Sequence, residues 1–302
     1  MPSLALLSAT VRWFLFAAAL VSTGAAAFRF LVVPRLRGAA SSLSDQLLRR
    51  AAGIGRTAAV VALLAIFARV PAQFAELRDP DMPALPQLKA LLFQTSWGKV
   101  WWAQVVIAGL LVPGFLMARK GSRTGWTMAG LLALALCCTP ALSGHAIGSE
   151  RLPTLAVVLD VAHVIAASMW LGAMFLLAAA LTVAERAGDG VTGSALVDAF
   201  SPMALMAAAS VAVTGLGSSY LHIGAVPDLW RSRYGRTLLL KLAAVGLVAG
   251  AGYLNWRRNG PALRNSGEIQ PMRRSVRLEL ALGALVLIAT AVLVATPPPG
   301  SE

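Results

Sequence analysis

The sequence predicts an all-α polytopic membrane protein, and three observations support this fold class. Hydrophobic residues make up 58% of the 302-residue chain and charged residues 13%, against roughly 25% charged residues in soluble domains. The mean hydropathy is +0.72. The apolar residues also gather in runs of about 20, the length that a helix needs to cross a bilayer. These runs are too long for barrel strands, and a helix satisfies its own backbone hydrogen bonds in lipid.

Eight apolar segments are long enough to be spans. The first could be misread as a signal peptide, because Arg12 precedes an apolar run that contains small residues at 24–27. That run resumes at Phe30 and ends at Pro34 and Arg35, so we expect a retained first span. The fifth segment is long, and we expect its last turns to leave the bilayer. The predicted spans are 10–33, 51–74, 100–118, 124–144, 153–184, 199–221, 236–256 and 274–296.

The charges of the loops predict an orientation. Loops 34–50, 119–123, 185–198 and 257–273 carry twelve Lys and Arg residues, whereas the opposite side, span edges included, carries eight. Basic residues favour the cytoplasmic side of a membrane, so both termini are expected outside. The same rule accounts for the formal net charge of +13. No patch of basic and aromatic residues indicates a nucleic-acid partner.

Two short stretches suggest an internal repeat. Residues 95–99 read Thr-Ser-Trp-Gly-Lys and residues 232–236 read Ser-Arg-Tyr-Gly-Arg, and each precedes a span, the third and the seventh. The spacing predicts one integral membrane domain over 1–302, a parallel 4+4 repeat of a first half (1–148) and a second half (149–302). A shared need for an interfacial aromatic residue and a glycine turn is the alternative explanation.

The chain has three histidines, and the predicted topology puts all of them on one side of the membrane. His163 lies ten residues, or about 15 Å, into the fifth span. His145 and His222 each follow a span that runs outward. A reversed orientation would move the three residues together. Because imidazole binds copper, zinc, iron and nickel, these residues predict a metal site in the outer half of the membrane.

Asp160 lies three residues before His163, which places both on one face of the helix. A carboxylate beside a histidine can fix the tautomer of the ring and raise its basicity as a ligand. Ionisable residues inside a membrane are costly and indicate function by default. The alternative is a structural ion pair of Asp160 with Lys241 or Arg69, both in outer halves of spans.

Two sulfur-containing residues complete the predicted ligand set. Cys138 lies seven residues before His145 on the same face, and Met169 lies six residues after His163. Thiolate and thioether groups suit Cu(I), although most buried Cys and Met residues only fill space. Cys137 and Cys138 are adjacent inside an apolar run, so no disulfide framework is expected.

Three motifs between residues 142 and 255 carry a resemblance to a known family. Residues 142–146 read Leu-Ser-Gly-His-Ala, residues 162–172 read Ala-His-Val-Ile-Ala-Ala-Ser-Met-Trp-Leu-Gly, and residues 234–241 read Tyr-Gly-Arg-Thr-Leu-Leu-Leu-Lys and lead to Asn255. Over roughly residues 130–260 the chain resembles the copper resistance protein D (CopD) family. The family usually has Gly-Gly after Trp-Leu, whereas this chain has Gly172-Ala173.

The resemblance implies a multi-pass protein of the bacterial inner membrane with copper as its substrate, and with the orientation that the loop charges predict, both termini lie in the periplasm. It implies copper import from periplasm to cytoplasm, often with a small periplasmic copper-binding partner of the CopC type; membrane lipid is the other expected partner. His145 and His163 are the histidines that match the family motifs. His222 joins them only because of its side and depth.

Two other functions remain open from the sequence. His163 with His222 or His145 could clamp haem b in a membrane electron carrier, although a typical two-haem membrane cytochrome needs four histidines. A non-transporting copper assembly or sensor protein could use the basic loop 228–236 to meet an acidic partner. No nucleotide loop, Ser-His-Asp set or metalloprotease motif is present, so we expect no enzyme.

Overall fold

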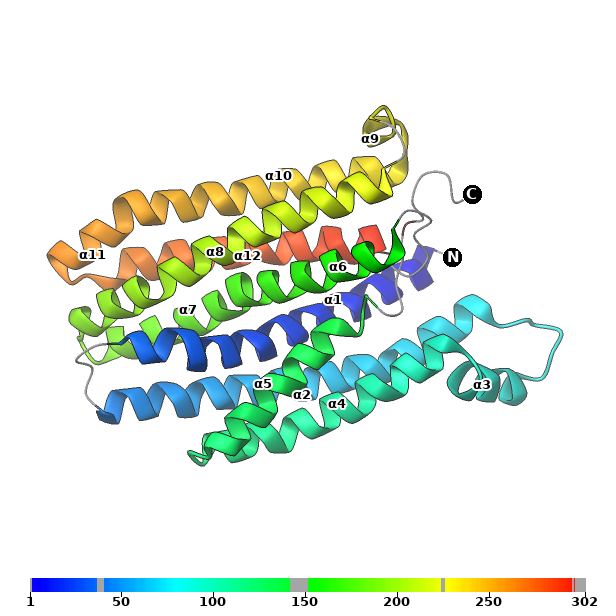
Figure 1. The fold of residues 1–302 in the computed structure, drawn as a ribbon, viewed down its shortest axis with the longest axis horizontal. Coiled ribbons are helices and arrows are strands. Elements are labelled where there is room, and N and C mark those ends of the chain that lie inside the picture. The colour runs from blue at the N-terminus through cyan, green and yellow to red at the C-terminus, as the bar shows by residue number, and fades with distance from the viewer. Residues whose placement is uncertain (1, 37–40, 142–151, 224–225, 295, 297–302) are drawn as a thin grey trace.

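The computed structural model describes residues 2–36, 41–141, 152–223, 226–294 and 296. Over these residues the chain is a bundle of long helices, and no strand is present in them (Figure 1). Seven helical stretches in the described ranges are long and apolar enough to cross a membrane. The predicted class, an all-helical membrane protein, is therefore confirmed. The stretches are Leu6–Arg35, Ser44–Leu77, Ser96–Arg119, Pro153–Arg186, Gly190–Leu221, Arg233–Ser266 and Ile269–Val294.

Several of these stretches combine α-helix with a turn of π- or 3₁₀-helix. A π-helical segment follows α1 in the first stretch (η1), joins α6 to α7 in the fourth (η3) and joins α10 to α11 in the sixth (η4). The elements are α1 (Pro2–Ala27), η1 (Phe28–Val32), η2 (Val33–Arg35), α2 (Ser41–Leu77), α3 (Ala84–Phe93), α4 (Ser96–Arg119), α5 (Arg123–Cys138), α6 (Pro153–Ala167), η3 (Ser168–Gly172), α7 (Ala173–Arg186), α8 (Gly190–His222), α9 (Asp228–Arg231), α10 (Arg233–Leu254), η4 (Asn255–Asn259), α11 (Gly260–Ser266) and α12 (Ile269–Val294).

The fourth predicted span, 124–144, corresponds to a shorter helix. α5 has 16 residues, fewer than the about 20 that a bilayer requires. It packs against α4 and α1 inside the bundle. Residues 142–151 lie outside the described residues, so seven long apolar helices, rather than eight, are established.

The bundle has two ends, which differ in the elements that they hold. One end, here called the α3/α9 end, holds both of those short helices, the start of α1 and the end of α12 (Figure 1). The opposite end holds the turn from α4 to α5 and the connection from α7 to α8. α1 and the α6–α7 stretch start at the α3/α9 end and run in the same direction.

The centre of the bundle is the contact between α1 and η3. A Cβ atom on Gly172 would lie 2.0 Å from the Leu20 carbonyl oxygen, and one on Gly24 would lie 2.1 Å from the Gly172 carbonyl carbon. A larger residue at either position would collide with backbone atoms of the other helix. Glycine at both positions is what allows the two helices to approach this closely. Ala173, where the family usually has glycine, is fully buried.

The start of α8 is capped by a carboxylate. Asp189 accepts hydrogen bonds from the backbone nitrogen of Thr192 at 2.9 Å and from its hydroxyl at 2.6 Å. These bonds hold the pKa of Asp189 below its ordinary value. An N-terminal cap of this kind satisfies backbone donors that the helix cannot satisfy itself.

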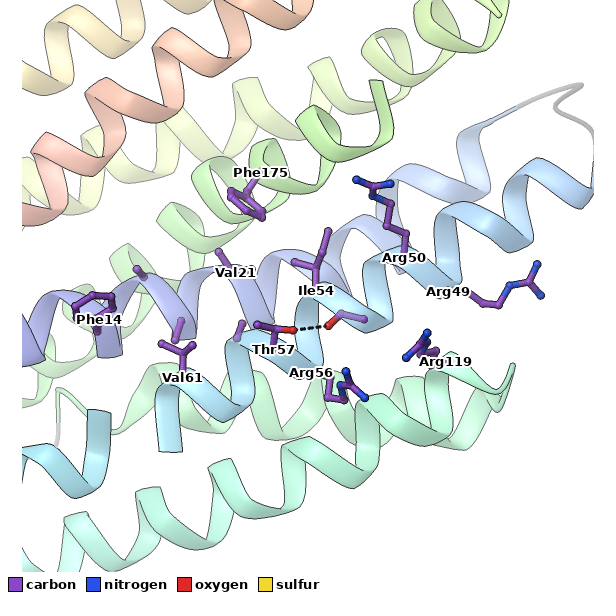
Figure 2. Close-up of a pocket in the computed structure, with 14 residues that line it drawn as sticks. Phe14, Val21, Arg49, Arg50, Ile54, Arg56, Thr57, Val61, Arg119 and Phe175 are labelled. Carbon is purple, nitrogen blue, oxygen red and sulfur yellow. Dashed lines mark hydrogen bonds between the residues drawn. The ribbon is translucent and has the colours of Figure 1, made fainter. Parts of the chain in front are cut away.

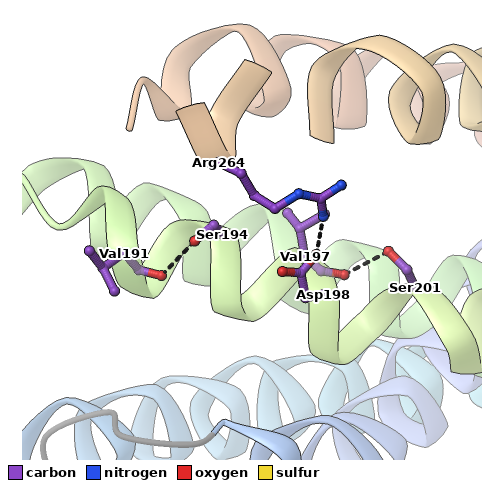
Figure 3. Close-up of polar contacts among 6 residues, drawn as sticks. All are labelled: Val191, Ser194, Val197, Asp198, Ser201 and Arg264. Atoms are coloured by element: carbon purple, nitrogen blue, oxygen red, sulfur yellow. Dashed lines mark hydrogen bonds and ion pairs between the residues drawn. The ribbon is translucent and has the colours of Figure 1, made fainter. Parts of the chain in front are cut away.

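Ion pairs connect neighbouring helices at the opposite end. Arg264 of α11 donates to Asp198 of α8 at 2.5 Å (Figure 3). About half of each of these two side chains is exposed, so the pair adds little stability. A second pair joins Arg273 of α12 to Glu185 of α7 and is more buried. Both pairs lie within the second half of the chain.

Candidate functional site

The strongest sequence-predicted residue, His163, lies on α6 with Asp160 one turn before it. Both side chains are half-buried. α6 begins at Pro153 at the α3/α9 end, so His163 lies about 15 Å from that start along the helix. The structure therefore has His163 ten residues into a long apolar helix with Asp160 one turn before it, and its depth in the membrane stays a prediction.

A hydrogen bond to α8 fixes the imidazole ring. His163 Nδ1 lies 3.0 Å from Thr214 Oγ1, and the same hydroxyl donates to the Ser210 carbonyl oxygen at 2.6 Å. A hydroxyl has one proton to donate. Since that proton is directed at Ser210, the remaining bond is best made by His163 Nδ1–H as donor. In this tautomer Nε2 carries the lone pair that a metal ion binds.

Glycine residues allow α8 to come close to this ring. A Cβ atom on Gly215 would lie 3.3 Å from His163 Cε1, and one on Gly217 would lie 3.0 Å from a methyl group of Leu159. Residues 214–219 read Thr-Gly-Leu-Gly-Ser-Ser, the small and hydroxyl composition that closely packed membrane helices favour. The ring of His163 therefore lies against the backbone of α8.

Two residues of α10 bring charge and a phenol to the same region. Asp160 is close enough to Lys241 and to Tyr234 to interact electrostatically with both. Lys241 interacts in the same way with His163. Of the two structural partners considered for Asp160, Lys241 is the one that interacts with it, whereas Arg69 donates to Gln104 at 2.9 Å. The region thus holds a carboxylate, an ammonium group and an imidazole, and the ammonium group interacts electrostatically with the other two.

The two adjacent cysteines differ in their surroundings. Cys138, the predicted ligand, is half-buried and its thiol donates to the Leu134 carbonyl oxygen at 3.3 Å. Cys137 is fully buried. Its sulfur lies 3.1 Å from Thr23 Oγ1 and 3.5 Å from Ser168 Oγ. It is therefore Cys137 that contacts the π-helical segment η3, which follows α6.

Of the remaining predicted ligands, the structure describes the side chain of Met169 but not those of His145 and His222. Met169 lies in η3, half-buried against the core. His145 falls in 142–151, outside the described residues, and His222 ends α8 with a side chain that the structure does not describe. Across the described ranges, no three His, Cys, Asp or Glu side chains form a group that could hold a metal ion. The full ligand set stays a prediction.

Sequence reasoning did not find Thr214, because it lies 51 residues from His163. No local pattern connects the two positions. One signal was available: the run of small and hydroxyl residues from 214 to 219 marks a close helix contact. Lys241 was considered only as a structural partner, although it lies beside the imidazole.

These observations define a class: a multi-pass helical membrane protein with a half-buried group of Asp160, His163 and Lys241 in its second half. Family comparison is more specific, because residues 1–152 match the N-terminal domain of copper resistance protein D-like proteins and residues 194–293 match copper resistance protein D. The chain belongs to the copper resistance protein D family.

One characterised relative is the copper transport protein CutJ of Bacillus subtilis (strain 168). It is 29% identical over 266 residues, which cover 85% of this chain and 48% of CutJ. The chain therefore spans about half the length of that relative. No solved structure matches the chain.

Proposed function

We propose that this protein imports copper across the bacterial inner membrane, with His163 as a ligand on the entry path. The observation that carries the proposal is the hydrogen bond from His163 Nδ1 to Thr214, which leaves Nε2 with its lone pair for a metal ion. Membership of the copper resistance protein D family and the similarity to a copper transport protein support copper as the substrate.

The proposed orientation of the bundle follows from the loop charges, and import is the direction that the family resemblance implies. The loops richer in Lys and Arg join the helices at the opposite end of the bundle, so the α3/α9 end, with the start of α1 and the end of α12, faces the periplasm in this proposal. Copper then enters at the end nearer His163. His145, His222, Cys138 and Met169 serve as further ligands in this proposal. A periplasmic donor of the CopC type delivers the ion.

The cluster suits passage better than storage. Among the described residues no closed group of ligands surrounds His163, and ligands spread along a path bind copper less tightly than a closed set of four would. Lys241 balances the charge of Asp160, so the carboxylate is not a strong independent trap for a cation. Conduction needs sites that bind an ion and also release it, and this arrangement provides both.

Replacing His163 by Ala should reduce copper accumulation to the level of cells that lack the protein. Accumulation is measured by elemental analysis of cells grown in added copper and is normalised to the amount of protein in the membrane. Thr214→Val should produce a partial loss, because the ring keeps Nε2 but loses the partner that fixes its tautomer. The matched control is Thr290→Val on α12, whose hydroxyl likewise bonds to the carbonyl four residues earlier, at 2.8 Å.

Unchanged copper accumulation in His163→Ala, at normal protein levels, would remove His163 from the mechanism. The other two functions give different results with the purified protein. A Soret absorption band lost in His163→Ala would favour the haem b electron carrier. Copper binding without flux into proteoliposomes would favour the assembly or sensor protein.

A further inference from the structure

A groove with apolar walls and a basic mouth lies between α1, α2, α4 and α7, away from the His163 cluster. Its volume is about 590 Å³. The walls include Phe14 and Val21 of α1, Ile54 and Val61 of α2, and Phe175 of α7. Four arginines also line it: Arg49, Arg50, Arg56 and Arg119.

The two kinds of side chain are separated along the groove. Figure 2 shows the four arginines on one side of the view and Phe14 and Val61 on the other. Arg49 and Arg50 lie in the first third of α2 and Arg119 ends α4, which places them towards the opposite end of the bundle, and Arg56 lies about two turns further along α2. From Arg49 to Val61 the helix rises about 18 Å, slightly more than half of a bilayer core. The groove therefore extends from the membrane surface towards the middle of the membrane.

The arginines have no carboxylate partner in the part of the chain that the structure describes. The ion pairs found there join Arg264 to Asp198 and Arg273 to Glu185. Asp45 lies one turn before Arg49 but forms no ion pair with it. Four unpaired guanidinium groups at one end of an apolar groove create a local positive potential, which an anionic group would balance. Arginine also binds phosphate with two parallel hydrogen bonds.

We propose that this groove binds one anionic phospholipid of the cytoplasmic leaflet, with its phosphate at the arginines and an acyl chain along the apolar walls. The loop charges put this end of the bundle in the cytoplasm, where anionic lipids meet basic pockets between membrane helices. A free phosphate would satisfy the arginines but would leave the walls, including the exposed rings of Phe14 and Phe175, uncovered. The lipid would contact α1, α2 and α7 together, and so join the first half of the chain to the second.

Gly53 provides a way to test the apolar part of the site. It lines the groove on α2, and a Cβ atom there would meet nothing within 4 Å. Gly53→Phe should therefore fill the groove without a backbone clash, and an aromatic residue is at least as good a helix former as glycine. The basic part is tested by Arg56→Gln combined with Arg119→Gln. Its matched control is Arg258→Gln combined with Arg274→Gln, two exposed arginines at the same end of the bundle.

The experiment is native mass spectrometry of the full chain in neutral detergent, titrated with phosphatidylglycerol or with phosphatidylcholine of the same acyl chains. Wild type and the matched control should retain one phosphatidylglycerol at least about tenfold more tightly than phosphatidylcholine. The Arg56 and Arg119 double variant should lose this preference. Gly53→Phe should lose the retained lipid of either type.

Several results would overturn the proposal. Equal retention of the two lipids by wild type would show that the site does not select an anionic headgroup. A preserved preference in the double variant, or retained lipid in Gly53→Phe, would place the lipid elsewhere. Displacement of the lipid by an equal concentration of glycerol 3-phosphate would show that the site is an anion site without a need for acyl chains.

Discussion

Two corners of the molecule, where α3 meets α4 and where α9 meets α10, are built with the same hydrogen bonds. In the first corner Thr95 precedes α4. Its hydroxyl accepts from the backbone nitrogen of Gly98 at 3.0 Å and donates to the carbonyl of Leu91, at the end of α3, at 2.6 Å. One side chain thus caps the long helix and joins it to the short one.

The second corner repeats each of these bonds. The hydroxyl of Ser232 accepts from Gly235 nitrogen at 2.9 Å and donates to the carbonyl of Asp228, in α9, at 2.7 Å. The likeness goes beyond the five-residue pattern in the sequence, because the short helix before each span takes part. It supports the 4+4 repeat, which stays a prediction for the chain as a whole.

The two halves differ at the position six residues after the corner glycines, Gly98 and Gly235. In the first half that position is Gln104, buried, which accepts from Arg69 at 2.9 Å and donates to Thr139 at 2.8 Å. In the second half it is Lys241, which interacts with Asp160 and His163. The same corner therefore supports a closed hydrogen-bond network in one half and a group of ionisable side chains in the other. We infer that the first half stabilises the bundle and the second carries the chemistry.

The largest expected effect comes from the glycine in each corner. In Gly98→Ala the new Cβ would lie 2.4 Å from a backbone oxygen of α3, and in Gly235→Ala it would lie 2.2 Å from a backbone oxygen of α9. Because backbone cannot move aside easily, each change should lower the free energy of unfolding by about 3 kcal/mol. Thermal unfolding of the purified protein in detergent measures it.

The chain supplies matched controls for both changes. Gly109 and Gly246 lie eleven residues after the corner glycines on the same two helices, and a Cβ at either meets nothing within 4 Å. Alanine there should leave stability unchanged or raise it by up to about 1 kcal/mol, since alanine favours helix over glycine. If one of the variants Gly98→Ala and Gly235→Ala lost much stability and the other lost none, the two corners would not be structurally equivalent.

The next effect separates stability from transport. Gln104→Leu removes the acceptor of a half-buried Arg69, so it should cost about 2 kcal/mol of stability, while copper accumulation per folded protein stays normal. Lys241→Gln should do the reverse: it should lower copper accumulation towards background at a near-normal melting temperature. Equal transport defects in the two variants would show that both polar groups act on copper and that the division between halves is wrong.

The sequence was sufficient for the class and for seven spans, because long apolar runs have few alternatives in water or lipid. The predicted fourth span, 124–144, extended too far. Apolar residues continue beyond Cys138, but Pro140 follows, and the residue before a proline disfavours helix. α5 ends at Cys138 accordingly. Proline was therefore a better guide to this boundary than hydropathy.

The site was predictable only where a single residue stood out. His163 is conspicuous because an ionisable residue inside a span is rare, whereas Thr214 gains its role only when α8 packs on α6. The choice between the cysteines shows the same limit. Spacing from His145 favours Cys138, which stays a prediction, and the sequence did not indicate that Cys137 contacts Thr23 and Ser168. Helix periodicity gives the relative direction of two side chains and does not say which direction faces the core.

The smallest effect tests the comparison most finely. Thr95→Ala and Ser232→Ala each remove a cap and a link to the preceding short helix, so each should cost about 1 kcal/mol of stability. Thr95→Ser and Ser232→Thr exchange the two caps and should cost less than half as much, because either hydroxyl can make both bonds. Unfolding in detergent, with copper accumulation measured beside it, gives the readout. The outcome against the repeat is a difference in stability between the two alanine variants that exceeds the measurement error, with no such difference between Thr95→Ser and Ser232→Thr. The two caps would then have the same geometry but contribute differently to stability, and the similarity would be limited to the turns.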